Sequence, residues 1–477
     1  MARRLLTLLA ALLLALGLGQ SSASAASFTN PVKSVKGADP WISYHNGNYY
    51  LVTTSWTSAI TIRKSTTLAG LSTAPSVQVW TGDAASRCCN IWAPELHFLN
   101  GRWYLYYVAG QNVSDYIPTQ RTHVLESAGS DPMGPYTYKA QLNSAWMLDP
   151  TVATINGSLY LFGSASGGTQ NLVAARMSNP YTVSGAFSTV STPTYDWERQ
   201  GGTVNEGPEI LQRGGRTFLI YSASGCWTPD YKLGQLELTG SNPLSASSWT
   251  KKSTPVFQRS DGNGVYGPGH NGFFTSPDGS ESWIVYHAND GASEGCDNGR
   301  TTRAQRFTWN SDGTPNFGTP VRLGASLAGP SGEPAAASTT YTVVNRNSGK
   351  CLDVAGSSSA DGANVQQYSC SGGSNQRWRL EDLGDDTHRL VNVATGKVLD
   401  TANCSADDGT DLRQWSWLNN TCQRFRFVAT DGGYVRIVNQ ATGKVADVAN
   451  CSTADGADVR QWTWLNNACQ QWRLTPA

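Results

Sequence analysis

The feature that most constrains the fold is a unit that occurs five times in the first two thirds of the chain. In each unit a short apolar strand meets a turn and continues into a strand rich in aromatic residues. The five units cover residues 39–55, 94–110, 149–165, 208–224 and 270–288. Their turn pairs are Asn46-Gly47, Asn100-Gly101, Asn156-Gly157, Gly214-Gly215 and Asp278-Gly279, at intervals of 54, 56, 58 and 64 residues. Such pairs supply the positive φ angles that tight hairpins require.

Antiparallel units repeated at this spacing predict an all-β protein built as a β-propeller, with about four strands in each blade. Counting one blade for each unit, we expect a five-bladed propeller over residues 27–323. A β-sandwich is the structural alternative.

Composition narrows the class of ligand. Lys and Arg together number 35, as do Asp and Glu, so the net charge is zero. This balance argues against nucleic acid or an anionic membrane surface as a partner, because both need a basic face. Charged residues make up only 15% of the chain, and the 17 Trp could supply flat faces for neutral polar ligands, although Trp is equally a core residue.

Residues 1–26 have the pattern of a signal peptide. Arg3 and Arg4 precede an apolar run over residues 5–18, and small residues follow it. No later apolar run is long enough to span a bilayer. We therefore expect a secreted, extracellular protein, whose ten cysteines form disulfides in an oxidising compartment. The sequence does not specify an oligomeric state, and a monomer is the default expectation.

Residues 324–340 are small, contain proline and lack apolar periodicity, which predicts a linker. The segment that follows, residues 341–477, repeats with a period of 47 residues. The period relates Asp353, Asp400 and Asp447, and likewise Gln376, Gln423 and Gln470. Three short-strand copies cannot each bury a core, so we expect them to close around a pseudo-threefold axis. Helical repeats could have the same period, but the strand-like runs YTVVN, RLVNV and YVRIV oppose them.

The repeated endings NQRWRL, CQRFRF and CQQWRL make this segment resemble the ricin B-type β-trefoil, a family 13 carbohydrate-binding module. The resemblance implies that each repeat can hold a sugar between an aspartate, an aromatic platform and late polar residues. The implied residues are Asp353, Tyr368, Asn375 and Gln376; Asp400, Trp415 and Gln423; and Asp447, Trp462 and Gln470. Trp378 and Trp472 are expected in the core instead. Cys404–Cys422 and Cys451–Cys469 have identical spacing and are expected to pair within their repeats, as is Cys351–Cys370.

Four of the five propeller units begin with a carboxylate in a turn that contains proline. These turns are Asp39-Pro40, Pro94-Glu95, Asp149-Pro150 and Glu206-Gly-Pro-Glu209, and the fifth unit begins with His270. The first strand of each blade lines the centre of a propeller, so Asp39, Asp149 and Glu206 should converge near its axis. A single Asp-Pro is typical of an ordinary turn. Three carboxylates in equivalent positions predict metal binding or acid–base chemistry on a neutral substrate.

The segments ADPWI, WAPELH, LDPTV, NEGPEI and PGHNGF resemble glycoside hydrolase family 43, over about residues 28–322. That family consists of five-bladed propellers that cleave α-L-arabinofuranosides or β-xylosides with inversion. The resemblance implies that Asp39 is the general base and Glu206 the general acid. Asp149 would orient the acid and raise its pKa.

Further residues take roles from the same resemblance. Arg303 would reach the terminal sugar, with a salt bridge as the alternative. Trp92 would stack on that sugar, with core burial as the alternative. His270 would lie beside a calcium or sodium ion on the axis, held mostly through water, and no cofactor is implied for the chemistry itself. Cys88 and Cys89 could form a vicinal disulfide or pair elsewhere. If they pair together, Cys226 and Cys296 are left for each other.

Within the family, SRCCN-x-WA, WMLD and CDNGRTTRAQRFTWNSDG look most like exo-acting α-1,5-L-arabinofuranosidases. The resemblance therefore implies release of L-arabinose from the ends of plant cell-wall arabinan, with the trefoil binding the polysaccharide. Alternatives on the same fold are arabinoxylan side-chain removal, β-xylosidase and endo-arabinanase. An alternative of another class is a carbohydrate-binding protein without catalysis, which the intact set of three acids argues against.

Overall fold

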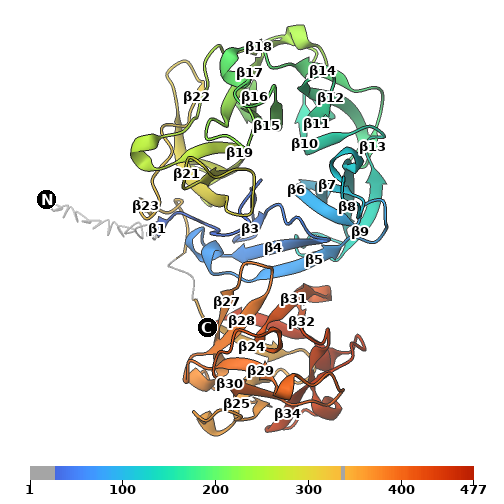
Figure 1. Cartoon of the computed structure of the whole chain (residues 1–477), viewed down its shortest axis with the longest axis vertical. Helices are drawn as coiled ribbons and strands as arrows, with labels where there is room; N and C mark the ends of the chain where they lie inside the picture. Colours follow the sequence, from blue (N-terminus) through green and yellow to red (C-terminus); the bar gives the residue numbers. More distant parts are fainter. Residues whose placement is uncertain (1–26, 335–338) are drawn as a thin grey trace, which may run out of the picture.

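The computed structural model describes residues 27–334 and 339–477, and it consists of β-strands joined by loops and short 3-10 segments (Figure 1). The predicted signal peptide, residues 1–26, and part of the predicted linker, residues 335–338, lie outside the described residues. No helix within the two described ranges has the length and apolar character needed to cross a membrane. The all-β prediction is confirmed.

Four antiparallel sheets follow one another along the first part of the chain, and Figure 1 shows them arranged in a ring. In each sheet the strands that follow one another in sequence lie side by side, except that β14 pairs with β12. The strands are β6 (Cys89–Leu99), β7 (Arg102–Gly110), β8 (Arg121–Ser127) and β9 (Tyr136–Gln141); β10 (Met147–Ile155), β11 (Ser158–Ser166), β12 (Gln170–Asn179), β13 (Thr182–Val183) and β14 (Ser188–Ser191); β15 (Asn205–Arg213), β16 (Arg216–Ala223), β17 (Lys232–Leu238) and β18 (Trp249–Lys251); and β19 (Tyr266–Thr275), β20 (Ser282–Asn289), β21 (Thr301–Trp309) and β22 (Pro315–Asn316). This arrangement is that of a propeller rather than of a β-sandwich.

The ring also contains β2 (Trp41–His45), β3 (Asn48–Val52), β4 (Ala59–Ser65) and β5 (Ser76–Thr81), paired in the same antiparallel order. Short β1 (Ser27–Thr29) pairs with β23 (Ser326–Ala328). Hairpin turns account for the registers. His45 faces Asn48 across Asn46-Gly47, and Ile155 faces Ser158 across Asn156-Gly157. Both residues of each of these turns have positive φ, as two-residue hairpins require.

The C-terminal part is a β-trefoil whose three repeats share one core. Its strands are β24 (Tyr341–Asn345), β25 (Cys351–Val354), β26 (Val365–Tyr368), β27 (Arg377–Asp382), β28 (His388–Asn392), β29 (Val398–Thr401), β30 (Leu412–Trp415), β31 (Phe425–Ala429), β32 (Val435–Asn439), β33 (Val445–Val448), β34 (Ala457–Trp462) and β35 (Trp472–Pro476). The related side chains Trp378, Phe425 and Trp472 are buried together in that core. The indoles of Trp378 and Trp472 donate to the carbonyls of Leu352 and Ala446, so the prediction that these two Trp are core residues is confirmed.

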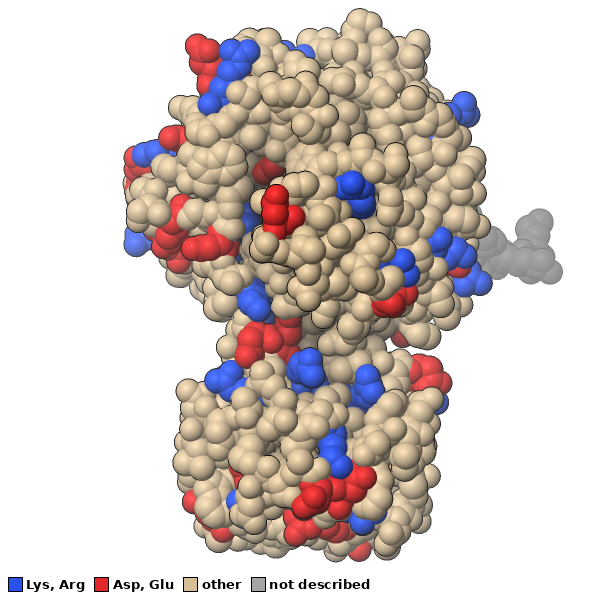
Figure 2. Space-filling view, turned by 45° about the vertical axis from the view of Figure 1, so that its right-hand side comes forward, with Lys and Arg blue, Asp and Glu red and all other residues tan. Residues whose placement is uncertain are grey.

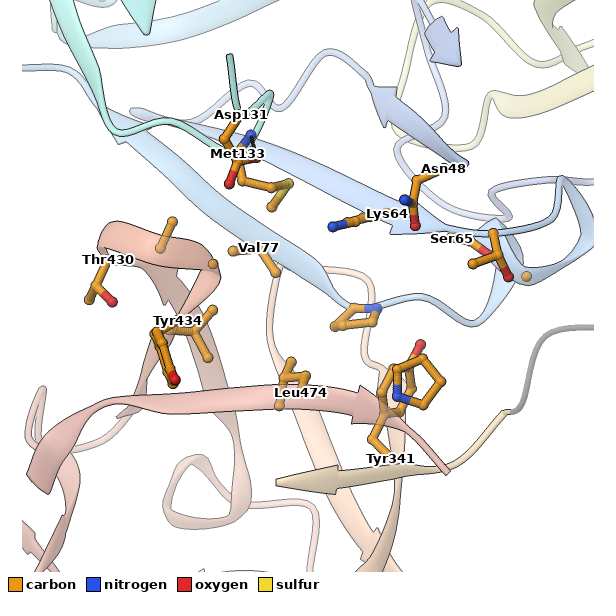
Figure 3. Close-up of a pocket in the computed structure, with 17 residues that line it drawn as sticks. Asn48, Lys64, Ser65, Val77, Asp131, Met133, Tyr341, Thr430, Tyr434 and Leu474 are labelled. Atoms are coloured by element: carbon orange, nitrogen blue, oxygen red, sulfur yellow. Dashed lines mark hydrogen bonds between the residues drawn. The ribbon is translucent and has the colours of Figure 1, made fainter. Parts of the chain in front are cut away.

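The trefoil docks on the β2–β5 sheet. Strand β5 pairs with β31 in parallel, where Val77 faces Phe427, and Val77 packs into the trefoil core. The buried guanidinium of Arg63 forms an ion pair with Asp382 across the junction. A cavity of about 290 Å³ also lies at this junction. Figure 3 shows Lys64, Met133 and Asp131 on the propeller side, facing Tyr341, Tyr434 and Leu474 of the trefoil.

The surface charge agrees with the neutral composition. On the face shown in Figure 2, uncharged residues predominate, and Lys and Arg are interspersed with Asp and Glu. No single basic field covers that face, as binding to a polyanion would require.

Candidate active site

The three predicted acids lie at the same end of three first strands. Asp39 precedes β2 by two residues, Asp149 is the third residue of β10, and Glu206 is the second residue of β15. The backbone N–H of Gly207 donates to Asp149 Oδ2 at 2.9 Å, which joins β15 to β10. His270 of β19 lies 3.3 Å from Asp39 Oδ1. The contact of His270 with Asp39 joins residues that are more than 200 positions apart in the sequence.

An unusual backbone conformation recurs at this end of the strands. Asp39, Asp149 and His270 have φ of 52°, 55° and 45°, in the left-handed region that residues with side chains rarely adopt. In β10 and β15 the strand register shifts at this point, as it does in a β-bulge. A bulge turns a side chain away from its regular direction, and here the redirected side chains form the carboxyl cluster. Such conformations concentrate at functional sites.

The carboxyl group of Asp39 is held in its ionised form. It lies among His270, His287 and Arg300, each 3.3–3.4 Å from Oδ1, and Thr54 donates a hydrogen bond to Oδ2. Burial raises the pKa of this carboxyl, but the charges of His270 and Arg300 and the hydrogen bond with His287 outweigh burial and lower it far below its usual range.

The other two acids have the opposite tendency. Burial, and then the charge of Asp39, raise the pKa of Asp149 to about 7. Burial, and then the charge of Asp149, raise the pKa of Glu206 to about 7. Glu206 is held by two donors, the hydroxyl of Tyr231 at 2.8 Å and the amide of Gln170 at 2.7 Å. The cluster therefore contains one carboxyl group whose pKa favours the ionised form and another that can carry a proton near neutral pH, which is the pairing that acid–base catalysis requires.

Sequence reasoning missed the residues that set these properties. Thr54, Gln170, Tyr231, His287 and Arg300 all lie outside the first strands, in later strands or in the loops before them. Tyr231 also stacks on His287, with ring centroids 5.6 Å apart and planes only 3° apart, so it links the surroundings of Glu206 with those of Asp39. Arg300 could have been found from the sequence, because it lies three residues before the predicted Arg303 in the same segment.

Arg303 itself is fully buried. It forms an ion pair with Asp290, and it donates to Thr301 Oγ1 at 3.0 Å and to the carbonyl of Asn289 at 3.2 Å. Trp92 lies in β6, packs edge-on against Tyr116 at 5.7 Å and has an indole N–H without a hydrogen-bond partner. The sugar contacts predicted for both residues stay predictions. Glu209, the second glutamate of the NEGPE segment, is buried and accepts a hydrogen bond from Thr151.

All ten cysteines are paired, in the five combinations anticipated from the sequence. The disulfides are Cys88–Cys89, Cys226–Cys296, Cys351–Cys370, Cys404–Cys422 and Cys451–Cys469. Cys226–Cys296 joins the β16–β17 loop to the β20–β21 loop.

In the first trefoil repeat, amides surround the predicted sugar-binding aspartate. Asp353 accepts hydrogen bonds from Gln366, Asn375 and Gln376 at 2.8–3.0 Å. Tyr368 is exposed beside it on β26, so its ring is available as a platform.

The other two repeats differ from the first. Arg413 pairs with Asp400 at 2.9 Å and covers the ring of Trp415 at 4.1 Å. Arg460 does the same with Asp447 and Trp462, at 3.3 and 4.2 Å. The position of Asn375 is taken by a disulfide-bonded cysteine in each, whereas the equivalent glutamines Gln376, Gln423 and Gln470 are buried in all three repeats. The structure thus separates the first repeat from the other two, a difference that the 47-residue spacing alone did not reveal.

Fold and site together define a β-propeller with an acid–base carboxyl cluster at the start of its first strands, joined to a β-trefoil. Residues 28–315 match the family described as Glycosyl hydrolases family 43, and the chain belongs to that family. Residues 332–415 and 421–477 match the ricin-type β-trefoil lectin domain-like family.

Several known proteins resemble this chain. An extracellular exo-alpha-(1->5)-L-arabinofuranosidase of Streptomyces avermitilis is 42% identical over 63% of this chain, and this chain spans 65% of the length of that protein. A protein of the same description from Streptomyces chartreusis is 39% identical over 57% of this chain and 85% of its own. The crystal structure of an alpha-L-arabinofuranosidase from Lactobacillus brevis, 34% identical, covers 62% of this chain and 98% of its own with a TM-score of 0.59.

Proposed function

We propose that the protein is a secreted, inverting glycoside hydrolase that releases L-arabinose from the ends of α-1,5-linked arabinan and arabino-oligosaccharides. The observation that carries the proposal is the clustering of Asp39, Asp149 and Glu206 at one end of their strands, where the pKa of Asp39 is lowered and that of Glu206 is raised. The names of the two Streptomyces relatives supply the substrate class, and their description as extracellular supports secretion.

The chemistry follows from the charge of each group. Asp39, ionised, takes a proton from a water molecule as that water attacks the anomeric carbon. Glu206, protonated, gives its proton to the glycosidic oxygen as the bond to the leaving sugar breaks. Asp149 accepts a hydrogen bond from the backbone N–H of Gly207, the residue after Glu206. The charge of Asp149 raises the pKa of Glu206 and so favours its protonated form. Single displacement by water gives inversion, in which the base and the acid lie on opposite sides of the sugar.

We also infer that the propeller has five blades, with β2–β5 as the first. This sheet has the strand order of the other four. At corresponding points in or just before the five first strands there is a residue of positive φ: Asp39, Ala93, Asp149, Gly207 and His270. Proline follows the first four of these residues. Because β5 pairs with β31, the sheet of this first blade continues into the sheet of the trefoil.

The mechanism needs no cofactor. The surroundings of His270 fit a directly bound calcium ion poorly, because calcium takes about six to eight oxygen ligands. The described residues contain no group of three or more His, Cys, Asp or Glu side chains placed to hold a metal. A calcium or sodium ion on the axis would therefore be held largely by water, and no step of the reaction passes through it.

The trefoil would hold the enzyme on plant cell-wall polysaccharide. Binding there raises the local concentration of chain ends without altering the chemistry at the propeller. The first repeat, with its exposed Tyr368 and amide-lined Asp353, has the residues best placed for this role.

The proposal is tested by the products formed from linear α-1,5-arabinan and, separately, from arabinoxylan. We expect arabinose alone from arabinan at all times, and little product from arabinoxylan. Early oligosaccharides would mean endo cleavage, and arabinose from arabinoxylan alone would mean side-chain removal. The NMR signal of the first sugar released checks inversion, because the α-linked substrate must give β-arabinose before mutarotation.

The pH dependence should follow Glu206. Because the acid must be protonated, kcat/KM should fall as pH rises through about 7, the pKa of Glu206. Asp149→Asn removes the charge that raises this pKa, so the alkaline limb should move to lower pH. Tyr231→Phe removes a hydrogen bond that favours the ionised form, so the limb should move to higher pH. Rate profiles of the three proteins check these opposite shifts, and shifts of the same sign would contradict the assignment.

A further inference from the structure

Trp227 is an exposed aromatic residue to which the proposed chemistry gives no role. It lies in the loop between β16 and β17, and 57% of its surface is exposed, a larger fraction than for Phe98 or Tyr368. Exposing an indole costs free energy that burial would recover, and the contacts of Trp227 hold it at the surface.

The indole packs against two glycines, Gly225 and Gly202. A Cβ atom on Gly225 would lie 2.5 Å from the ring, and one on Gly202 would lie 2.9 Å from it. Neither glycine has a positive φ, so the backbone does not demand glycine there. Space for the indole therefore accounts for the missing side chains. The ring nitrogen also donates to the carbonyl of Gly201 at 3.2 Å, which fixes the orientation of the ring.

The loop that carries Trp227 is also tied down covalently. The adjacent Cys226 forms a disulfide with Cys296 of the β20–β21 loop. The carbonyl of Cys296 accepts a hydrogen bond from Arg300, which contacts Asp39. A surface aromatic that is fixed by a nearby disulfide, by a hydrogen bond and by close packing on two glycines loses little conformational entropy when a ligand stacks on it.

One of these two glycines, Gly202, is close to Glu206 in the sequence. Gly202, against which the indole packs, lies four residues before Glu206, so at 3.3 Å per residue the backbones of these two residues are at most about 13 Å apart. The loop that holds Trp227 is on the same end of the blade as Glu206, because Asn205 pairs with Ala223 at the end of β16. The exposed ring is therefore on the face of the propeller where the carboxyl cluster lies.

We propose that Trp227 is a stacking platform for a sugar ring of the departing chain, at least one unit beyond the bond that is cleaved. This inference rests on the proposed function. The general acid protonates the leaving oxygen, so the surface that continues from Glu206 toward Gly202 is where the leaving chain would lie. An indole face covers the apolar C–H face of a sugar, and a rigid platform at this distance holds only substrates of several units.

The test compares a long and a short substrate. The long one is α-1,5-arabinopentaose, and the short one is 4-nitrophenyl α-L-arabinofuranoside, which has no sugar beyond the cleaved bond. With Trp227→Ala, the ratio of kcat/KM for the pentaose to kcat/KM for the aryl glycoside should fall about five- to tenfold, through KM, as expected for losing one stacking contact. Trp227→Tyr, which keeps an aromatic face, should recover most of that ratio.

Phe98→Ala is the matched control. Phe98 is also an exposed aromatic, at the opposite end of its first strand beside the Asn100-Gly101 turn, so its removal should leave the ratio unchanged. An unchanged ratio in Trp227→Ala, with the wild-type protein active, would overturn the platform and leave the proposed function intact. A wild-type protein inactive on both substrates would instead overturn the proposed function. An equal fall on both substrates, not recovered by Tyr, would show that Trp227 only supports the loop.

Discussion

Glu206→Gln should lower kcat on arabinan by about 10²- to 10⁴-fold, the contribution typical of a positioned general acid. Glutamine keeps the size of the side chain and can still contact Tyr231 and Gln170, but it has no proton to give. The loss should be much smaller on 2,4-dinitrophenyl α-L-arabinofuranoside, because that leaving group departs as a stable anion without protonation. The values of kcat for the wild-type protein and for Glu206→Gln, measured on both substrates, check the prediction.

Glu209→Gln is the control for this experiment, since both glutamates belong to the same short segment around Gly207-Pro208. Glu209 contacts Thr151 rather than the residues that hold Glu206. We expect its replacement by the isosteric amide to leave kcat within a few-fold of the wild-type value. Equal losses on arabinan and on the dinitrophenyl substrate in Glu206→Gln would show that this residue does not act as the proton donor.

The positions of the three acids could be predicted because their signal is local. Each lies one or two residues before a proline at the start of a strand, and the hairpin turn that follows fixes the register that carries it to the same end of its sheet. Turn chemistry depends on neighbouring residues alone. The all-β class and the shared core of the trefoil followed in the same way, from turn pairs and from a 47-residue period.

The partners of these acids could not be predicted because their contacts exist only in the closed ring. His287 and Arg300 meet Asp39 from the other end of the propeller sequence, more than 240 residues away. Tyr231 lies in a loop with no motif to mark it. The resemblance implied a role for Arg303, which the structure buries against Asp290, whereas Arg300 is the arginine in contact with Asp39, the proposed general base.

The junction of the two domains was hidden for the same reason. The small, proline-containing segment 324–340 indicates a linker, but the composition of a linker says nothing about the surfaces on either side of it. Val77 is an ordinary strand residue in sequence, yet it packs into the core of the trefoil, and Arg63 meets Asp382 from more than 300 residues away. Deleting the trefoil would therefore expose apolar surface on β5 and leave a buried arginine unpaired. Substitutions at Tyr368 or Asp353 are cleaner probes of polysaccharide binding.

Asp39→Asn should also abolish most activity, but with a different dependence on the leaving group. The amide can still contact Thr54, yet it cannot accept a proton from water. We expect kcat to fall by at least about 10²-fold on arabinan and on the dinitrophenyl substrate alike, because attack by water is required whichever group leaves. Kinetics on both substrates, beside those of Glu206→Gln, check the prediction.

The contrast between the two variants distinguishes the base from the acid, which loss of activity alone cannot do. Asp39→Asn also removes the negative charge that faces His270, His287 and Arg300, so the melting temperature of the variant must be measured beside its rate. A folded variant that recovers on the dinitrophenyl substrate would make Asp39 the proton donor and reverse the two roles. The proposed roles of the two carboxyl groups require one pattern. Asp39→Asn must lose activity on both substrates, and only Glu206→Gln must regain activity on the dinitrophenyl substrate.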